Sequence, residues 1–261
     1  MRRAAFSVLI LMLFLLFYGC APRKVVTPVP KISKDALLDS LLSMDKKVET
    51  ITIHGKATFE WGDHKKRFSV HEITKREKNL INLHIDGPFG VTTAILWFCK
   101  PESICIYLPS SKAVLLEPLG KSIENVVVPP EREILTDMIS GLVPLRYFAD
   151  SVMDFELVES GAYITFIKSG KVLVVFARPD PWHVESYEFS KIDDLRGQLD
   201  VSFPEGELVD GVWLPKKIVI NAPSVKQKIE VEVRKIKLNE QLPDSLFQIK
   251  IPDNVKWMRA Y

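Results

Sequence analysis

The two cysteines at positions 99 and 105 are the residues of this chain best suited to covalent chemistry. Five residues separate them, which is not the CxxC spacing of redox-active thiols, so a bond between them would be structural. A hairpin with a three-residue loop over 101–103 would place Cys99 opposite Cys105, close enough for a disulfide. A two-residue loop would displace the two cysteines by one position. Two buried free thiols are therefore the alternative.

The histidines show none of the spacings that metal binding or general-base catalysis needs. No HExxH motif or paired His and Cys motif includes any of the five, His54, His64, His71, His84 and His183. The chain also has no nucleophile elbow, P-loop or dinucleotide fingerprint. Gly87-Pro88-Phe89-Gly90 is not a phosphate loop, because proline lacks an N–H donor. We therefore expect no enzyme activity, no metal and no cofactor, and we interpret these histidines as surface residues.

Cys20 follows a segment that is typical of an export signal. Arg2 and Arg3 precede an uncharged apolar stretch over residues 4–18, and Gly19 stands directly before Cys20. The stretch is shorter than the ~20 residues that a membrane-spanning helix needs. Residues 1–19 resemble a bacterial lipoprotein signal peptide, which implies cleavage after Gly19 and diacylation of the Cys20 thiol. An uncleaved signal anchor with an incidental cysteine is the alternative, and both place the domain outside the cytoplasm.

The residues after this cysteine predict how the domain is held. Ala21, by resemblance to bacterial sorting signals, favours the periplasmic face of the outer membrane. Residues 20–32 hold the lipidated cysteine and three prolines without periodicity, which indicates an extended tether. Two or three acyl chains hold a protein firmly on a membrane. Residues 33–261 are long enough for one core, so we expect a single, monomeric domain.

The charge balance argues against nucleic acid as a partner. Arg2 and Arg3 lie in the leader, so the remaining chain has 33 basic and 33 acidic side chains. A neutral chain with scattered charges lacks the basic field that nucleic acid binding requires.

Alternation with period two dominates residues 33–261 and predicts half-buried antiparallel strands. It is clearest over residues 51–61 and recurs over 199–203 and 228–234. Turn signals at 160–161, 169–170, 204–206 and 210–211 separate such runs at hairpin intervals. We expect about ten strands in total.

Two segments have helical spacing instead. Residues 34–44 carry a leucine stripe behind Ser33 as a candidate N-cap, and residues 131–143 carry a second apolar stripe behind Pro129-Pro130. The fold class predicted is mainly β: a strongly twisted antiparallel sheet with short apolar helices on its inner face.

Several short motifs resemble the LolA/LolB lipoprotein-localisation family, and the LolB branch most. They are residues 53–61 (IHGKATFEW), 85–91 (IDGPFGV), 138–145 (MISGLVPL), 210–215 (DGVWLP) and 243–247 (PDSLF). The resemblance implies an incomplete antiparallel β-barrel, a half-barrel, whose open side is plugged by helices. It also implies an apolar cavity that receives acyl chains.

Such a cavity needs smooth apolar walls, because acyl chains offer only area, worth ~25 cal/mol per Å². The candidate lining residues are Phe59, Trp61, Leu83, Ile85, Ile95 and Trp97 from strands and Ile134, Met138 and Leu142 from the plug helix. Packing of these residues into a closed core is the alternative.

Phe89 is the sharper candidate. An apolar residue in the turn Pro88-Phe89-Gly90 cannot easily face inward, and an exposed aromatic can enter a bilayer interface. LolB-like proteins carry an apolar residue at the matching turn, which the resemblance implicates in delivering cargo into the membrane. Packing of Phe89 against a neighbouring strand is the alternative.

Two functions follow as hypotheses. The first is an outer-membrane lipoprotein that accepts acylated lipoprotein or lipid cargo from a periplasmic LolA-like carrier and inserts it into the membrane. The second is a lipoprotein of the same fold that serves as a protein-binding scaffold or lipid sensor.

Overall fold

The computed structural model describes residues 30–120, 131–192 and 194–259. The chain from Lys31 to Tyr261 forms one compact unit. The predicted signal peptide, Cys20 and most of the tether lie outside the described residues, as do Pro129 and Pro130. None of the helices in the described ranges is long and apolar enough to cross a membrane.

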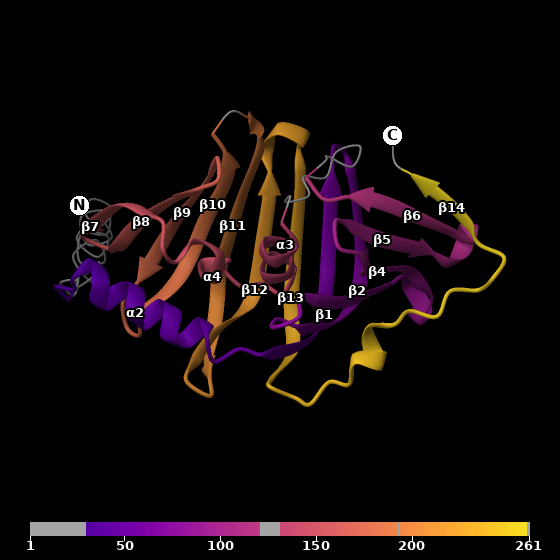
Figure 1. Ribbon diagram of the computed structural model, residues 1–261, viewed down its shortest axis with the longest axis horizontal. Helices are drawn as coiled ribbons and strands as arrows, with labels where there is room; N and C mark the ends of the chain where they lie inside the picture. Colours follow the sequence, from indigo (N-terminus) through magenta and orange to yellow (C-terminus); the bar gives the residue numbers. More distant parts are fainter. Residues whose placement is uncertain (1–29, 121–130, 193, 260–261) are drawn as a thin grey trace, which may run out of the picture. The chain divides into compact units, whose positions relative to one another are not determined.

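Fourteen strands in the described residues form a single twisted sheet (Figure 1). They are β1 (Thr50–Trp61), β2 (His64–Lys75), β3 (Leu80–Asp86), β4 (Thr92–Lys100), β5 (Ser103–Leu108), β6 (Ala113–Pro118), β7 (Val152–Val158), β8 (Gly161–Lys168), β9 (Lys171–Arg178), β10 (His183–Lys191), β11 (Asp194–Val209), β12 (Val212–Ala222), β13 (Gln227–Leu238) and β14 (Lys256–Arg259).

The sheet consists of two runs of consecutive antiparallel strands. β1 to β6 build one half and β7 to β13 the other. β1 pairs with β13 along its length, with Ile51 opposite Leu238 and Trp61 opposite Gln227, and this pair joins the halves. β14 pairs with β6 in parallel. Because β7 and β14 are the two edges, the sheet is not closed, which is the half-barrel that the family resemblance implies.

Helices lie on one face of this sheet, which we call the inner face (Figure 1). The α-helices are α2 (Lys34–Asp45), α3 (Arg132–Ile139) and α4 (Leu145–Phe148), and single 3-10 turns are η1 (Pro88–Gly90), η2 (Pro109–Ser111), η3 (Pro223–Val225) and η4 (Asp244–Phe247). Ser33 caps α2, as predicted, by accepting a hydrogen bond from the Ala36 N–H at 3.2 Å. α3 ends at Ile139, four residues before the end expected at residue 143.

The largest core lies between these helices and strands β8 to β12. Leu37 and Leu41 of α2 and Ile134 of α3 pack there against inner-face residues such as Phe166 and Tyr187. The side of α2 that carries the leucine stripe therefore faces the core, as predicted.

One predicted turn is wrong. Residues 204–206 lie inside β11, where the ladder to β12 shifts register twice around Glu205. A β-bulge accommodates the extra residues without reversing the strand. Glycine is required at position 206, because a Cβ there would lie 2.1 Å from the Trp213 ring. The chain also has more strands than the ten expected.

Candidate functional site

A row of apolar side chains crosses the inner face of strands β3 to β6. Leu83 lies opposite Leu96, Leu96 opposite Ile106, and Ile106 opposite Leu115. Directly opposed residues share a face, so the row is continuous. All four side chains are only half-buried. We call these four residues the inner row.

The nine predicted cavity residues fall into three groups. Phe59, Trp61, Leu83 and Ile85 are half-buried inner-face residues of β1 and β3. Ile134 and Met138 of α3 are buried in the main core, and Leu142 is buried in a smaller cluster with Ile51 and Leu214. Ile95 and Trp97 are on the opposite face. The structure therefore does not bring all nine together.

The placement of Ile95 and Trp97 corrects the sequence interpretation. On the outer face they pack in a cluster that includes Ile249 and Ile251, which belong to the segment leading to β14. The inner face of β4 instead carries Leu96 and Phe98, which pack with Leu135 and Ile139 of α3. Residues 94–99 are an unbroken apolar run, so periodicity could not reveal which side faces inward.

A buried ion-pair network holds α3 on the sheet. Arg76, in the turn between β2 and β3, donates to both carboxylate oxygens of Asp137 in α3, at 2.9 and 3.1 Å. It also donates to the Asp45 carboxylate at the end of α2, at 2.8 Å. The Arg76 side chain is 4% exposed and that of Asp137 is 0% exposed. One guanidinium therefore ties two helices to a strand turn.

Arg146 of α4 completes this network from the other side. Its Nε donates to Asp137 at 2.9 Å, and its other nitrogens donate to the Arg76 carbonyl and to the Asn79 side chain. Two guanidiniums thus face the two carboxylates of Asp45 and Asp137, and the buried charges balance. Burial raises the pKa of Asp45 to about 6, against the opposing attraction of Arg76.

A second polar contact fixes the end of α3. Glu72, on the inner face of β2, accepts hydrogen bonds from the hydroxyls of Ser140 at 2.6 Å and Thr74 at 2.8 Å. Burial raises the pKa of Glu72 to about 6, while these two hydrogen bonds act in the opposite direction. Helix movement away from the sheet would break both this contact and the ion pairs.

The space beneath the helices is nearly filled. A cavity of about 60 Å³ remains between the end of α2, the segment after α3 and strands β10 to β12. Leu41, Leu142 and Phe203 line it, with His183 and Trp213 stacked at 4.3 Å among its walls. It is much smaller than the ~300 Å³ at which ligand pockets begin. A larger ligand beneath the helices would need them to move.

The predicted insertion loop is held outward by its backbone. Phe89 is fully exposed, at 103%, and Val91 is 65% exposed. The Gly87 N–H donates to the Val91 carbonyl at 2.8 Å and closes the loop. Phe89 and Gly90 both have positive φ, 63° and 72°. This conformation is unfavourable for phenylalanine and is the kind of local strain found at functional sites.

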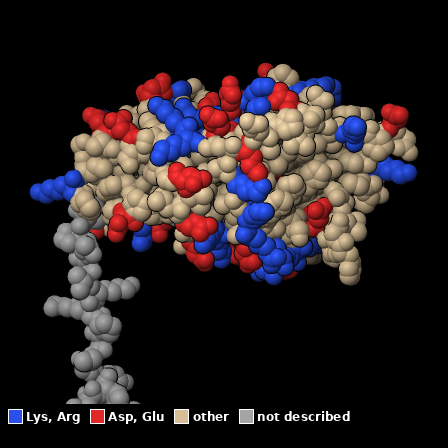
Figure 2. Space-filling view, turned by 90° about the horizontal axis from the view of Figure 1, so that it is seen from below, with Lys and Arg blue, Asp and Glu red and all other residues tan. Residues whose placement is uncertain are grey.

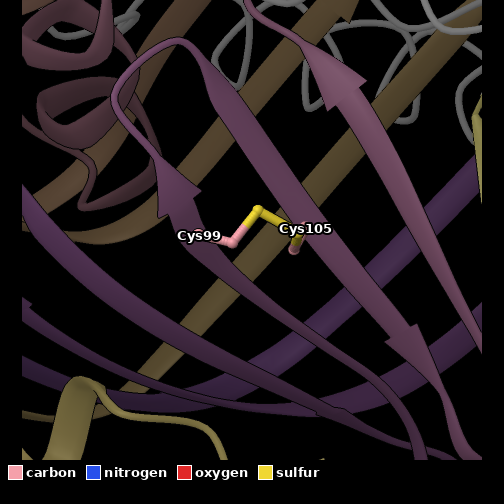
Figure 3. The surroundings of a disulfide bond; sticks show 2 residues. All are labelled: Cys99 and Cys105. Atoms are coloured by element: carbon pink, nitrogen blue, oxygen red, sulfur yellow. A yellow bond between two sulfur atoms is a disulfide. The ribbon is translucent and has the colours of Figure 1, made fainter. Parts of the chain in front are cut away.

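Cys99 and Cys105 form a disulfide across β4 and β5, with Cα atoms 5.7 Å apart (Figure 3). The loop differs from the one expected. Lys100 pairs with Ser103, which leaves a two-residue loop, and Trp97 rather than Cys99 lies opposite Cys105. A register shift between Phe98 and Lys100 brings Cys99 within reach.

Acidic and basic side chains are interspersed over the face shown in Figure 2, and a run of basic groups extends from its centre to its lower edge. Exposed ion pairs also occur, such as Arg67 with Glu232 and Lys216 with Glu207. This arrangement fits the balanced composition.

Solved structures of similar fold identify the architecture. A DUF1329 family protein from Desulfovibrio piger is 14% identical, with a TM-score of 0.55 over 82% of this chain and 96% of that one. A domain assigned to outer membrane lipoprotein sorting in Vibrio parahaemolyticus is 13% identical, with a TM-score of 0.58 over 80% and 95%. A LolA superfamily protein from Nitrosomonas europaea is 12% identical, with a TM-score of 0.57 over 84% and 99%.

These matches define the fold as the LolA-like open half-barrel. No protein family model matches the sequence, and no curated protein matches it either.

Proposed function

We propose that this chain is an outer-membrane lipoprotein, anchored through acylated Cys20, that binds acyl chains of lipoproteins or lipids and helps to insert them into the membrane. The observation that carries the proposal is the course of β3. The strand supplies Leu83 and Ile85 to the half-buried inner face and then leads directly into the loop that exposes Phe89. An apolar surface for cargo and an apolar tip for the bilayer are thus adjacent.

The likeness to LolA-superfamily and lipoprotein-sorting structures supports cargo of this kind. Acyl chains would lie along the inner row, where area alone provides the binding energy. In the manner of the LolB branch, the protein would receive cargo from a periplasmic carrier and release it without covalent chemistry.

Replacement of Phe89 by serine tests the delivery step. Burial of one phenylalanine side chain contributes ~1.5–3 kcal/mol, so Phe89→Ser should slow cargo transfer into lipid vesicles about tenfold or more. Folding should not change, because Phe89 makes no buried contact. Transfer of an acylated lipoprotein from the purified, detergent-extracted chain to vesicles measures the effect.

Leu208→Ser is the matched control, since Leu208 is also an exposed apolar residue but lies at the β11–β12 hairpin. The insertion role of Phe89 would be wrong if Phe89→Ser transferred cargo as fast as the wild type. It would also be wrong if Phe89→Ser and Leu208→Ser lost transfer equally.

Cargo binding has a separate test. Native mass spectrometry of the purified chain should show co-purified acyl ligand that acylated cargo displaces. Ile106→Glu in the inner row should abolish it, whereas Ile167→Glu, at an exposed apolar position of β8, should not.

The scaffold function is the second candidate, and the filled core under the helices favours it. The cavity there holds only about 60 Å³. A chain that neither carries nor exchanges acyl ligand would leave the scaffold as the better account.

A further inference from the structure

Three of the five histidines come together on the outer face of the sheet. His54 of β1 lies opposite His71 of β2, and His71 lies opposite His84 of β3. The three therefore form one row across three neighbouring strands, on the face opposite the helices. Their separation in the sequence conceals this arrangement.

The distances between the rings bracket those of metal-bound imidazoles. His54 and His71 have ring centroids 4.1 Å apart, and His71 and His84 have centroids 6.3 Å apart. With metal–nitrogen distances of ~2.0–2.1 Å, two imidazoles on one ion have centroids roughly 5 Å apart. Side-chain rotations would bring both distances toward this value, with the exposed His54 leaving its stacked position on His71.

Asp86 adds a carboxylate to the row. It follows His84 by two residues on the same strand and lies opposite Ser69, two residues before His71, so it shares their face. Its Oδ1 is buried and has no hydrogen-bond partner among the described residues. Buried carboxylate oxygens are normally paired, so this unpaired atom is an independent sign of a missing ligand.

The surrounding charges indicate which end of the row is favourable for a cation. Lys235 of β13 lies opposite His54, and Lys56 follows it on β1, so that end is positive. Next to His71, Lys56 and Asp86 both lie opposite Ser69, so an ammonium and a carboxylate flank that histidine. Asp86 follows His84 on the same strand and the uncharged Ile95 of β4 lies opposite His84, so the His84 end is the favourable one for a cation.

We propose that His71, His84 and Asp86, with His54 as a fourth ligand, bind one divalent transition-metal ion on the outer face. Imidazoles with one carboxylate suit Zn²⁺, and imidazole sites also accept Cu²⁺ and Ni²⁺. In the residues described, no three such side chains already surround a common point, so binding requires the rotations above. The site lies at the end of β3 that leads to the Phe89 loop, but on the face away from the inner row.

Titration of the full chain with ZnCl₂ tests the site. The chain is extracted in detergent without a histidine tag and studied by isothermal calorimetry, with Co²⁺ absorbance as a second probe of coordination. We expect one ion per chain. His71→Phe keeps an aromatic ring between His54 and His84 and should weaken binding at least tenfold, and Asp86→Asn should weaken it as well.

His64→Ala is the control, because His64 is an exposed histidine at the other end of β2 and outside the row. It should leave both stoichiometry and affinity unchanged. Absence of saturable one-to-one binding would overturn the proposal, as would an equal loss in His64→Ala and His71→Phe. Thermal unfolding of each variant shows that a loss of binding is not a loss of fold.

Discussion

Asp137 is a buried charge that depends on its neighbours. Its carboxylate has no exposed surface and lies between the guanidiniums of Arg76 and Arg146. A buried charge with good partners contributes little net stability, but it becomes costly when a partner is removed. The network is therefore needed to hold α3 on the sheet, but it adds little to the net stability of the fold.

Arg76→Ala should lower the free energy of unfolding by ~3–5 kcal/mol, because it leaves the Asp137 charge buried with one partner fewer. Urea denaturation followed by circular dichroism measures the loss. Lys168→Ala, which removes an ion pair with the exposed Asp150, should change the midpoint little. Similar losses in both variants would show that burial does not decide the effect.

At the scale of elements, β1 and β4 show what periodicity can and cannot reveal. β1 alternates apolar and polar residues, so its inner face, from Ile51 to Trp61, was predicted correctly. β4 carries apolar residues on both faces, because α3 covers one side and the segment around Ile249 covers the other. Only the pairing of Leu83 with Leu96 settles the orientation of β4, and pairing is not visible in one sequence.

The β4–β5 hairpin is where the disulfide should matter. The closed loop is short, with Cys99 and Cys105 six positions apart, so chain entropy predicts a stabilisation of about 2 kcal/mol. The double variant Cys99→Ala, Cys105→Ala should lose this amount in urea denaturation. Unchanged unfolding of the wild type after complete reduction would contradict the estimate.

The row of histidines shows the same limit on a larger scale. His54, His71 and His84 have no motif spacing, and they were interpreted as separate surface residues. Three strands in register bring them together. The class of fold could be predicted from local patterns, but side-chain clusters that depend on register could not.

At the scale of the whole molecule, the raised pKa of Asp45 predicts an unusual dependence of stability on pH. Its pKa is about 6 in the folded protein, above the ordinary value of 3.8, because burial disfavours the carboxylate. A raised carboxyl pKa contributes stability below pH 3.8 that is lost as the pH rises through about 6. The melting temperature should therefore fall between pH 4 and pH 7 by more in wild type than in Asp45→Asn.

Thermal unfolding at these two pH values measures the difference. Asp150→Asn is the control, since Asp150 is exposed and its pKa is lowered by Lys168, so this variant should retain the wild-type fall. An identical fall in Asp45→Asn would show that Asp45 does not titrate in this range.

The pairing of β1 with β13 joins residues that are far apart in the sequence, so we expect it to form late in folding. The strand at the centre of the sheet finds its second neighbour only when almost the whole chain is available. Such long-range pairing is slow, and until it forms, the twelve residues of β1 are a long unpaired edge open to other chains. A chain shortened before Gln227 would therefore aggregate through β1, even though every residue of the inner row and the Phe89 loop would still be present.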